Sequence, residues 1–164
     1  MDLFVIRHGE AGRSSPTRDE SKRALTMEGE KEMRDISKGI KALGVEFDYI
    51  FTSPLLRAKQ TAQIIYEVVP CKNSIQEVGD LRPEGNKLQL YNKFSRLKQD
   101  SAILIVGHEP YLSELVVETI STGQCRIDLK KGGLARIRMT TILPKPKGEL
   151  RWLLTPKHLK RIVR

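Results

Sequence analysis

The sequence LFVIRHGEAG, residues 3–12, places an arginine, a histidine and a glycine directly after four apolar residues. Such an apolar run is typical of a strand buried on both faces, as strands of parallel sheets are. Arg7 and His8 lie at its carboxyl end, where hydrophobic packing does not explain the presence of a cation and an imidazole. Because ligands of open α/β sheets bind outside the carboxyl ends of the strands, we expect these two side chains to meet a ligand.

The rest of the chain alternates between strand and helix patterns. Apolar runs predict strands at residues 3–6, 49–52, 75–78, 102–106, 134–139 and 150–154. Helical periodicity predicts helices around residues 33–43, 55–65, 88–97 and 111–120. We therefore predict a three-layer α/β/α sandwich with a mostly parallel, mixed sheet, helices on both faces and the last two strands at one edge.

Local signals place some of the boundaries between these elements. Gly44 supplies a stop for the first helix. Ser53 and Pro54 predict the N-cap and the first helical position of the second helix. Residues 144–148, with two prolines and a glycine, predict a loop.

The composition is that of an ordinary globular chain. With 164 residues, 39% hydrophobic and 30% charged, we expect one domain spanning residues 1–164. Asp2 and Arg7 interrupt the early apolar run, and no stretch approaches the ~20 apolar residues of a membrane span, so we expect neither a signal peptide nor a membrane partner. Cys71 and Cys125 lie far apart with no metal-ligand spacing, which favours a reducing, cytoplasmic setting.

The net charge of +9 belongs entirely to the carboxyl-terminal part of the chain. Residues 1–118 hold 17 Lys+Arg against 18 Asp+Glu, a net −1, whereas residues 119–164 hold 12 against 2, a net +10. This region is either a solvated basic face or a surface that steers acidic partners. Trp152 is its one aromatic residue, too few for stacking bases, so we expect no stable nucleic-acid partner.

A second histidine and a second arginine follow other strands of the predicted sheet. His108 comes directly after the most apolar strand, and Arg57 lies one turn into the helix after the second strand. Arginine forks match phosphate oxygens, and the helix that opens after His108 can add backbone N–H donors from Glu109 onward. Arg7, His8, Arg57 and His108 thus predict a phosphate site.

No cofactor is expected at this site. The chain has neither a Walker-type loop nor a dinucleotide GxGxxG motif, and the arginines would repel a metal ion. Positive neighbours lower the pKa of a histidine and keep its lone pair free near pH 7. We therefore expect His8 to be a nucleophile, with Arg7, Arg57 and His108 holding the phosphoryl oxygens.

The chain resembles the histidine phosphatase superfamily, which has the phosphoglycerate mutase-like fold. The motifs that carry this resemblance are RHGE at 7–10, TSPLLRAKQTA at 52–62 and IVGHEP at 105–110. RALTMEG at 23–29 and LRPEGN at 81–86 are similar to the SixA-type phosphohistidine phosphatases. The resemblance implies a covalent phosphohistidine intermediate on His8 and a phosphorylated protein substrate, for which a histidine-phosphotransfer domain is a candidate.

Other positions are assigned less specific roles by the same comparison of motifs. Gly9, Arg23 and Glu109 are candidates for binding phosphate or substrate, although Arg23 also fits an ordinary loop arginine. Mutase-like members carry an asparagine where this chain has Ser14, and a glutamate acid where this chain offers either Asp80 or Glu84. The general acid is therefore undecided between these two carboxylates.

The undecided acid bears on the substrate. A phosphorylated imidazole leaves as neutral imidazole once its ring is protonated, whereas an alkoxide needs a proton from an acid. No long insertion is present to form a lid over a small molecule. Both points favour a phosphohistidine protein. The alternatives are a small-molecule phosphomonoesterase or mutase with the same four residues, and a phosphate-binding or nucleic-acid-associated module.

Overall fold

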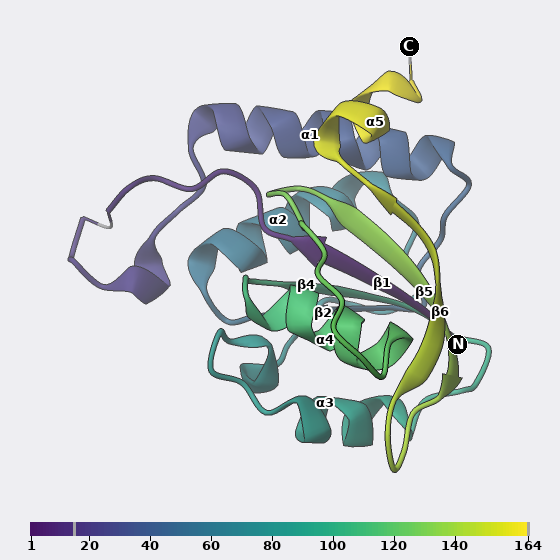
Figure 1. Ribbon diagram of the computed structural model, residues 1–164. Helices are drawn as coiled ribbons and strands as arrows, with labels where there is room; N and C mark the ends of the chain where they lie inside the picture. Colours follow the sequence, from purple (N-terminus) through teal and green to yellow (C-terminus); the bar gives the residue numbers. More distant parts are fainter. Residues whose placement is uncertain (15, 164) are drawn as a thin grey trace.

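The first strand runs through the middle of the sheet. The computed structural model describes residues 1–14 and 16–163. In it, β1 (Asp2–Arg7) pairs in parallel with β4 (Ala102–Gly107) and antiparallel with β5 (Leu134–Thr141). Its apolar residues are buried on both faces, as a central strand requires. The apolar run at residues 3–6 therefore occupies the centre of the fold (Figure 1).

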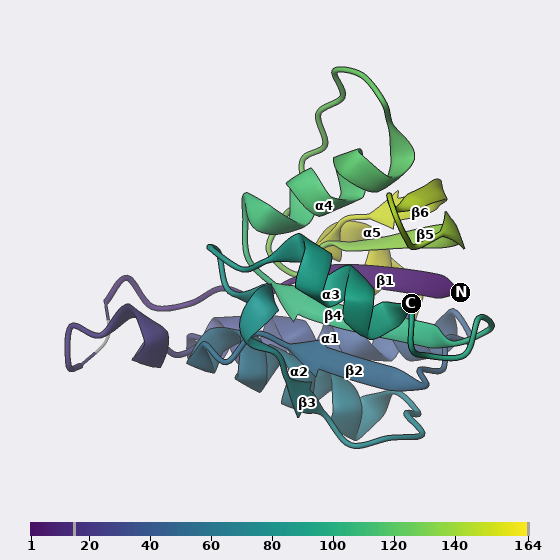
Figure 2. The same ribbon diagram turned by 90° about the horizontal axis from the view of Figure 1, so that it is seen from below.

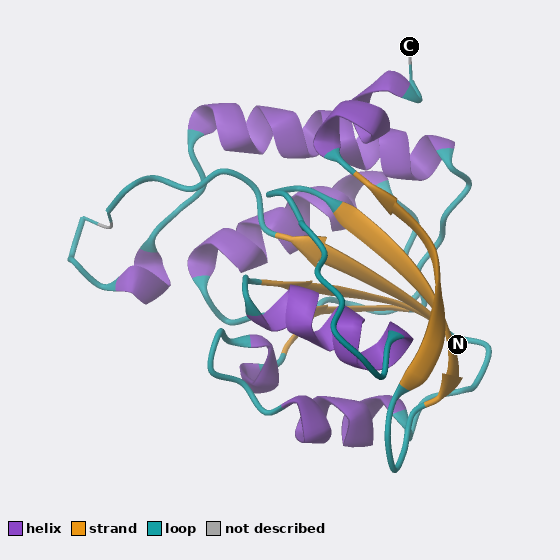
Figure 3. Cartoon of the chain, viewed as in Figure 1, coloured by secondary structure: helices purple, strands orange, loops and turns teal. Residues whose placement is uncertain are grey.

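The remaining elements complete a mixed sheet. β2 (Tyr49–Thr52) and β3 (Gln76–Glu77) extend it in parallel beyond β4, and β6 (Lys147–Leu154) pairs antiparallel with β5 at the other edge. In the described residues the strand order is β3-β2-β4-β1-β5-β6. Parallel strands joined by helices, with two late strands closing one edge, confirm the predicted α/β class (Figure 3).

Helices cover both faces of this sheet. The helices are α1 (Met27–Ala42), α2 (Leu56–Val68), α3 (Lys87–Phe94), α4 (Tyr111–Ile120) and α5 (Pro156–Arg161), with short 3-10 turns η1 (Glu20–Lys22) and η2 (Gly79–Leu81). α1, α2 and α5 lie on one face, and α3 and α4 on the other (Figure 2).

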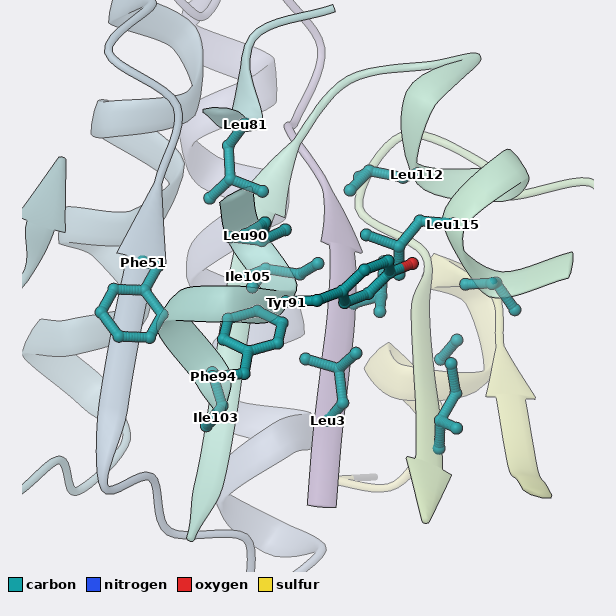
Figure 4. Close-up of a cluster of buried hydrophobic side chains, with 14 of the residues drawn as sticks. Leu3, Phe51, Leu81, Leu90, Tyr91, Phe94, Ile103, Ile105, Leu112 and Leu115 are labelled. Carbon is teal, nitrogen blue, oxygen red and sulfur yellow. The ribbon is translucent and has the colours of Figure 1, made fainter. Parts of the chain in front are cut away.

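The alternation of β1 side chains separates two apolar cores. Phe4 and Ile6 point toward α1 and α2, whereas Leu3 and Val5 point toward α3 and α4. Figure 4 shows the second core, in which Tyr91 and Leu115 meet between the two helices and the sheet. The three-layer sandwich follows from a strand whose alternate residues are apolar on both sides.

Two predicted boundaries need correction. Gly44 does follow the end of α1 and adopts φ 69°, which favours glycine. Ser53 was expected to cap α2, but that helix begins at Leu56 and its N-cap residue, Leu55, makes no side-chain capping bond. The predicted loop at residues 144–148 lies two positions earlier, at 142–146, because β5 ends at Thr141 and β6 begins at Lys147.

The order of the strands brings three strand ends together. β1, β4 and β2 are neighbours and run in parallel, with Arg7 opposite Gly107 and Thr52 opposite Val106. Residues that directly follow these strands must therefore lie next to each other at one edge of the sheet. His8, Ser53 and His108 are those residues.

Candidate active site

Backbone hydrogen bonds continue beyond the strands and fix the start of each connecting loop. The His8 N–H donates to the Gly107 carbonyl oxygen at 3.1 Å, and the Ser53 N–H donates to the Val106 carbonyl oxygen at 3.0 Å. The rings of His8 and His108 come within 5.1 Å, measured between their centroids. The predicted meeting of the two histidines is thus present in the structure.

The hydrogen bonds of His8 define its protonation. Its Nδ1 lies 2.7 Å from the carbonyl oxygen of Gly9, which can only accept, so Nδ1 carries the proton. Its Nε2 accepts a hydrogen bond from Arg57 Nε at 3.3 Å. The lone pair on Nε2 therefore points toward the guanidinium of Arg57.

The environment of His8 keeps the ring neutral. His8 is only 6% exposed, and burial lowers its pKa from 6.5 to about 4, against the opposing effect of the bond to Gly9. The charges of Arg57, Arg7 and Lys131 contribute to this lowered pKa. Near pH 7 the imidazole is uncharged and nucleophilic.

Arg57 is held in place by the first turn of α2 and by the loop before α1. Its Nη1 donates to the Glu20 carbonyl oxygen at 2.9 Å, and the side chain is 6% exposed. Burial and the nearby charge of Arg23 lower its pKa, but a guanidinium remains protonated at any working pH. Arg57 thus presents a fixed positive charge beside His8.

Gly9 has a packing role that leaves its backbone close to the site. Its N–H donates to Thr61 Oγ1 at 3.1 Å, and that hydroxyl donates to the Arg57 carbonyl oxygen at 2.8 Å. A Cβ at Gly9 would lie 2.6 Å from Met33 Cγ. The glycine therefore permits α1 and α2 to close around the loop that carries His8.

His108 is the more deeply buried of the two histidines, at 2% exposure. Its Nε2 lies 2.8 Å from Ser53 Oγ, and its Nδ1 is buried with no hydrogen-bond partner. Burial, followed by the charges of His8, Arg57, Arg23 and Arg7, lowers its pKa from 6.5 to about 3. His108 is accordingly neutral, and its Nδ1 is the ring nitrogen that has no partner within the protein.

Arg7 reaches the same region from the end of β1. Its Nη1 donates to the Leu129 carbonyl oxygen at 3.2 Å, whereas its Nε is buried with no partner. The Gly132 N–H donates to the Arg7 carbonyl oxygen, and Gly132 has φ 70°. The double glycine at 132–133 is thus a tight turn beside the end of β1 that carries Arg7.

The candidate general acids do not join the four central residues. Asp80 is half-buried in η2, and Glu84 is exposed in the turn that follows. In the described part of the chain, no carboxylate forms an ion pair with Arg7, His8, Arg57 or His108. Glu20 contacts Arg57 through its backbone carbonyl oxygen and not through its carboxylate. Neither candidate acid is therefore held at the four central residues by an ion pair.

Glu109 and Arg23 lie at the border of the site with contacts of their own. Glu109 Oε1 accepts the Ser113 N–H at 3.0 Å, so this carboxylate occupies the start of α4, where backbone donors to phosphate were expected. Arg23 pairs with Glu20 at 3.1 Å and donates to the Gly12 carbonyl oxygen at 3.3 Å. Arg23 still acts on the site through its charge, because it lowers the pKa of His108.

Ser53 and Thr61 lie in the site, although the sequence pattern gives neither residue a role there. Both lie within TSPLLRAKQTA, and Ser53 was interpreted as a helix cap because Ser-Pro is a common cap signal. Their position on the segment that carries Arg57 was the available signal. Neither the spacing nor the residue type reveals that Ser53 faces a histidine from another strand.

Two features are absent from the described residues. Residues 1–14 and 16–163 contain no group of three or more His, Cys, Asp or Glu side chains placed to hold a metal ion. None of the helices in this part of the chain combines the length and apolar composition that a bilayer span requires.

The chain matches known proteins over nearly its whole length. The family model of the histidine phosphatase superfamily (branch 1) matches residues 3–82. An uncharacterised protein of Picosynechococcus sp. is 33% identical, covering 97% of this chain and 99% of that protein. The phosphohistidine phosphatase SixA of Escherichia coli is 26% identical, covering 98% of this chain and 97% of that protein.

Solved structures agree with these relatives. A protein histidine phosphatase SixA complexed with tungstate superposes with a TM-score of 0.85 at 25% identity, covering 97% of this chain and 99% of that one. A putative alpha-ribazole-5'-P phosphatase from Escherichia coli superposes with a TM-score of 0.73 at 18% identity, covering 95% of this chain and 97% of that one. The second similarity concerns the fold alone.

Proposed function

Because the chain belongs to the histidine phosphatase superfamily, as a phosphatase of the SixA type, we propose that it hydrolyses phosphohistidine on a protein substrate through a phosphorylated His8. The observation that carries this proposal is the state of His8. A carbonyl oxygen fixes its proton on Nδ1, while burial and nearby cations keep Nε2 unprotonated, with its lone pair directed toward Arg57.

The first step is a phosphoryl transfer between two imidazoles. The Nε2 lone pair of His8 forms a bond to phosphorus, and the P–N bond of the substrate breaks. The substrate imidazole departs with the electron pair of that bond, as a neutral ring when its other nitrogen already carries a proton. No carboxylic acid is required to protonate this leaving group.

Charge on the transferring phosphoryl group is stabilised by fixed donors. Arg7 and Arg57 supply guanidinium N–H groups, and the unpartnered His108 Nδ1 supplies one more contact. Electrostatic positioning of this kind provides most of the catalysis in phosphoryl transfer. The arginines neutralise charge that a divalent metal would otherwise offset.

The second step releases phosphate from the enzyme. Water attacks phosphorus, the bond from phosphorus to His8 Nε2 breaks, and the electron pair of that bond returns to the ring. Because Gly9 still holds the Nδ1 proton, His8 departs as a neutral imidazole. The displaced water proton remains with the phosphate product or passes to solvent, which regenerates the starting enzyme.

A small-molecule phosphomonoesterase is the second candidate, supported by the similarity of the fold to a putative alpha-ribazole-5'-P phosphatase. An ester departs as a strongly basic alkoxide and needs a positioned acid, worth typically 10²- to 10⁴-fold. Glu84 is exposed, and Asp80 makes no ion pair with the four central residues. This arrangement favours the P–N substrate.

A substrate panel distinguishes the two candidates. The test compares kcat/KM for a phosphohistidine-bearing histidine-phosphotransfer domain with kcat/KM for alkyl phosphates, each with and without a chelator. We expect the phosphoprotein to be preferred and the chelator to have no effect. Faster hydrolysis of alkyl phosphates with negligible action on phosphohistidine, or a strict need for added metal, would reject the proposal.

Glu84→Gln tests the leaving-group argument within the same panel, with Glu46→Gln, an exposed glutamate outside the predicted motifs, as the matched control. We expect Glu84→Gln to leave the phosphohistidine rate within about 3-fold and to reduce only the slow ester rate. A loss above 10²-fold on phosphohistidine would mean that Glu84 acts on the P–N bond, contrary to the mechanism.

A further inference from the structure

We propose that Ser53 is a positioning residue that fixes the tautomer of His108, so that the neutral ring presents an Nδ1–H donor to the phosphoryl group. This inference rests on the proposed function for its catalytic consequence, although the tautomer itself is a property of the enzyme alone. It assigns a role to a hydroxyl that was expected only to cap a helix.

The position of Ser53 is rigid. It is the first residue after β2, its side chain is 0% exposed, and its N–H is bonded to the Val106 carbonyl oxygen. Pro54 restricts the backbone on its other side. The hydroxyl is therefore delivered to His108 Nε2, at 2.8 Å, by the sheet itself.

The number of available protons determines whether Ser53 Oγ or His108 Nε2 is the donor in the hydrogen bond between them. Ser53 Oγ already accepts the Leu55 N–H at 3.3 Å, and its single proton needs an acceptor. In the described residues, His108 Nε2 is the one further partner within reach of this hydroxyl. When the hydroxyl donates, the Ser53 proton and the His108 Nε2 lone pair satisfy each other, and the His108 proton lies on Nδ1, the nitrogen that has no partner within the protein.

The opposite tautomer leaves two groups badly placed. If His108 Nε2 carried the proton, the Ser53 proton would be buried without an acceptor, which is unfavourable. The His108 Nδ1 lone pair would then be buried at a site whose other groups are cations, and it would repel an anion. The Nδ1–H form avoids both penalties and adds a donor to those of Arg7 and Arg57.

His8 and His108 therefore receive opposite tautomers from their first neighbours. The carbonyl oxygen of Gly9 accepts a hydrogen bond from His8 Nδ1–H, which leaves the lone pair on Nε2. The hydroxyl of Ser53 donates a hydrogen bond to His108 Nε2, which leaves the N–H on Nδ1. Two histidine rings whose centroids are 5.1 Å apart thus have different roles: His8 is the nucleophile and His108 is a hydrogen-bond donor.

Nitrogen-15 NMR of the ring nitrogens reads these tautomers without any substrate. In the wild-type enzyme at pH 7 we expect His108 to be neutral with a protonated Nδ1, with assignments made from a His108→Gln variant. An Nε2–H ring in the wild type would overturn the proposal. Since the measurement needs no turnover, its outcome is separate from that of the substrate panel.

Ser53→Ala, with Ser37→Ala as the control, tests the consequence. Ser37 is also 0% exposed and donates to the Met33 carbonyl oxygen at 2.7 Å, so its loss removes an equally buried hydroxyl outside the site. We expect Ser53→Ala to mix the His108 tautomers and to lower kcat about 10- to 10²-fold with little change in KM.

Ser53→Thr is the conservative variant for this test. Ser53→Thr keeps the hydroxyl, so it should restore the Nδ1–H tautomer and a kcat within about 3-fold of wild type. Ser37→Ala should change neither the tautomer nor kcat. A Ser53→Ala variant with an unchanged His108 spectrum would reject the proposal, whether or not its kcat falls.

Discussion

His8 shows how a single residue acquires its chemistry from its immediate contacts. The Gly9 carbonyl oxygen at 2.7 Å holds one ring nitrogen, and Arg57 Nε at 3.3 Å faces the other. A histidine at a strand end is usually a simple hydrogen-bonding residue. Here the two bonds leave a neutral ring with a directed lone pair, as a nucleophile requires.

Replacing His8 by alanine should abolish turnover and leave the fold intact. The change removes the attacking nitrogen but alters only a residue at the edge of the sheet, so kcat should fall at least ~10³-fold. Steady-state kinetics with a phosphohistidine protein, together with far-UV circular dichroism, checks both parts. His158→Ala, at an exposed histidine on α5, is the control and should behave as wild type. Near wild-type activity in His8→Ala would exclude the covalent route.

The two buried histidines should make stability depend on pH. Folding lowers their pKa values from 6.5 to about 4 for His8 and about 3 for His108, so the unfolded chain binds more protons below pH 6.5. The free energy of unfolding should therefore fall as pH drops from 6.5 toward 4, by about 2 kcal/mol per histidine at pH 5.

Urea unfolding at pH 7 and pH 5 measures this loss. The His8→Gln/His108→Gln double variant lacks both titrating groups, so it should lose about 4 kcal/mol less than the wild type between the two pH values. An equal loss in both proteins would show that the histidines are not kept neutral by the fold.

At the scale of the elements, α1 connects the site to the carboxyl-terminal helix α5. A Cβ at Gly39 would lie 2.1 Å from the Leu159 carbonyl oxygen, so α5 packs directly on the α1 backbone (Figure 1). Leu159 is fully buried against α1, and Lys160 on the same helix pairs with Glu32. The carboxyl-terminal helix thus braces the helix that contacts Gly9.

Gly39→Ala should destabilise the protein although alanine is the better helix former. The added methyl forces α5 away from α1, which should cost about 1–3 kcal/mol in urea unfolding, with kcat unchanged. Gly123→Ala, where the new Cβ meets nothing within 4 Å, is the control. A more stable Gly39→Ala protein, as helix propensity alone predicts, would contradict the packing account.

The strands and the long helices could be predicted from sequence because apolar periodicity determines them. β2 spans the predicted residues 49–52 and α4 the predicted residues 111–120. α5 escaped prediction because it has six residues, and Leu159 alone among them is buried. Ser53 was misread because local cap chemistry and a long-range contact to His108 use the same residue type.

The whole molecule distributes its positive charge unevenly. Arg136 and Arg138 pair with Asp2 at the start of β1, the end of the strand away from His8. Lys131, in contrast, pairs with Glu10 beside the site and lowers the pKa of His8. A part of the carboxyl-terminal excess therefore lies where an acidic protein substrate would approach.

Salt should affect substrate association more than chemistry. Raising ionic strength to physiological levels shortens the screening length to ~8 Å, so KM for an acidic phosphoprotein should rise while kcat changes little. A small phosphate ester serves as the control, because its approach depends less on the protein surface. Equal effects of salt on both substrates would mean that the basic region does not steer the partner.

The most direct test of the account is to trap the enzyme during turnover. Mixing the enzyme with a ³²P-labelled phosphohistidine protein, quenching in alkali and mapping the peptides locates the transferred phosphoryl group. We expect a transient label on the peptide that contains His8 and no label in His8→Ala. A label on any other residue, or rapid hydrolysis by His8→Ala with no labelled enzyme, would contradict it.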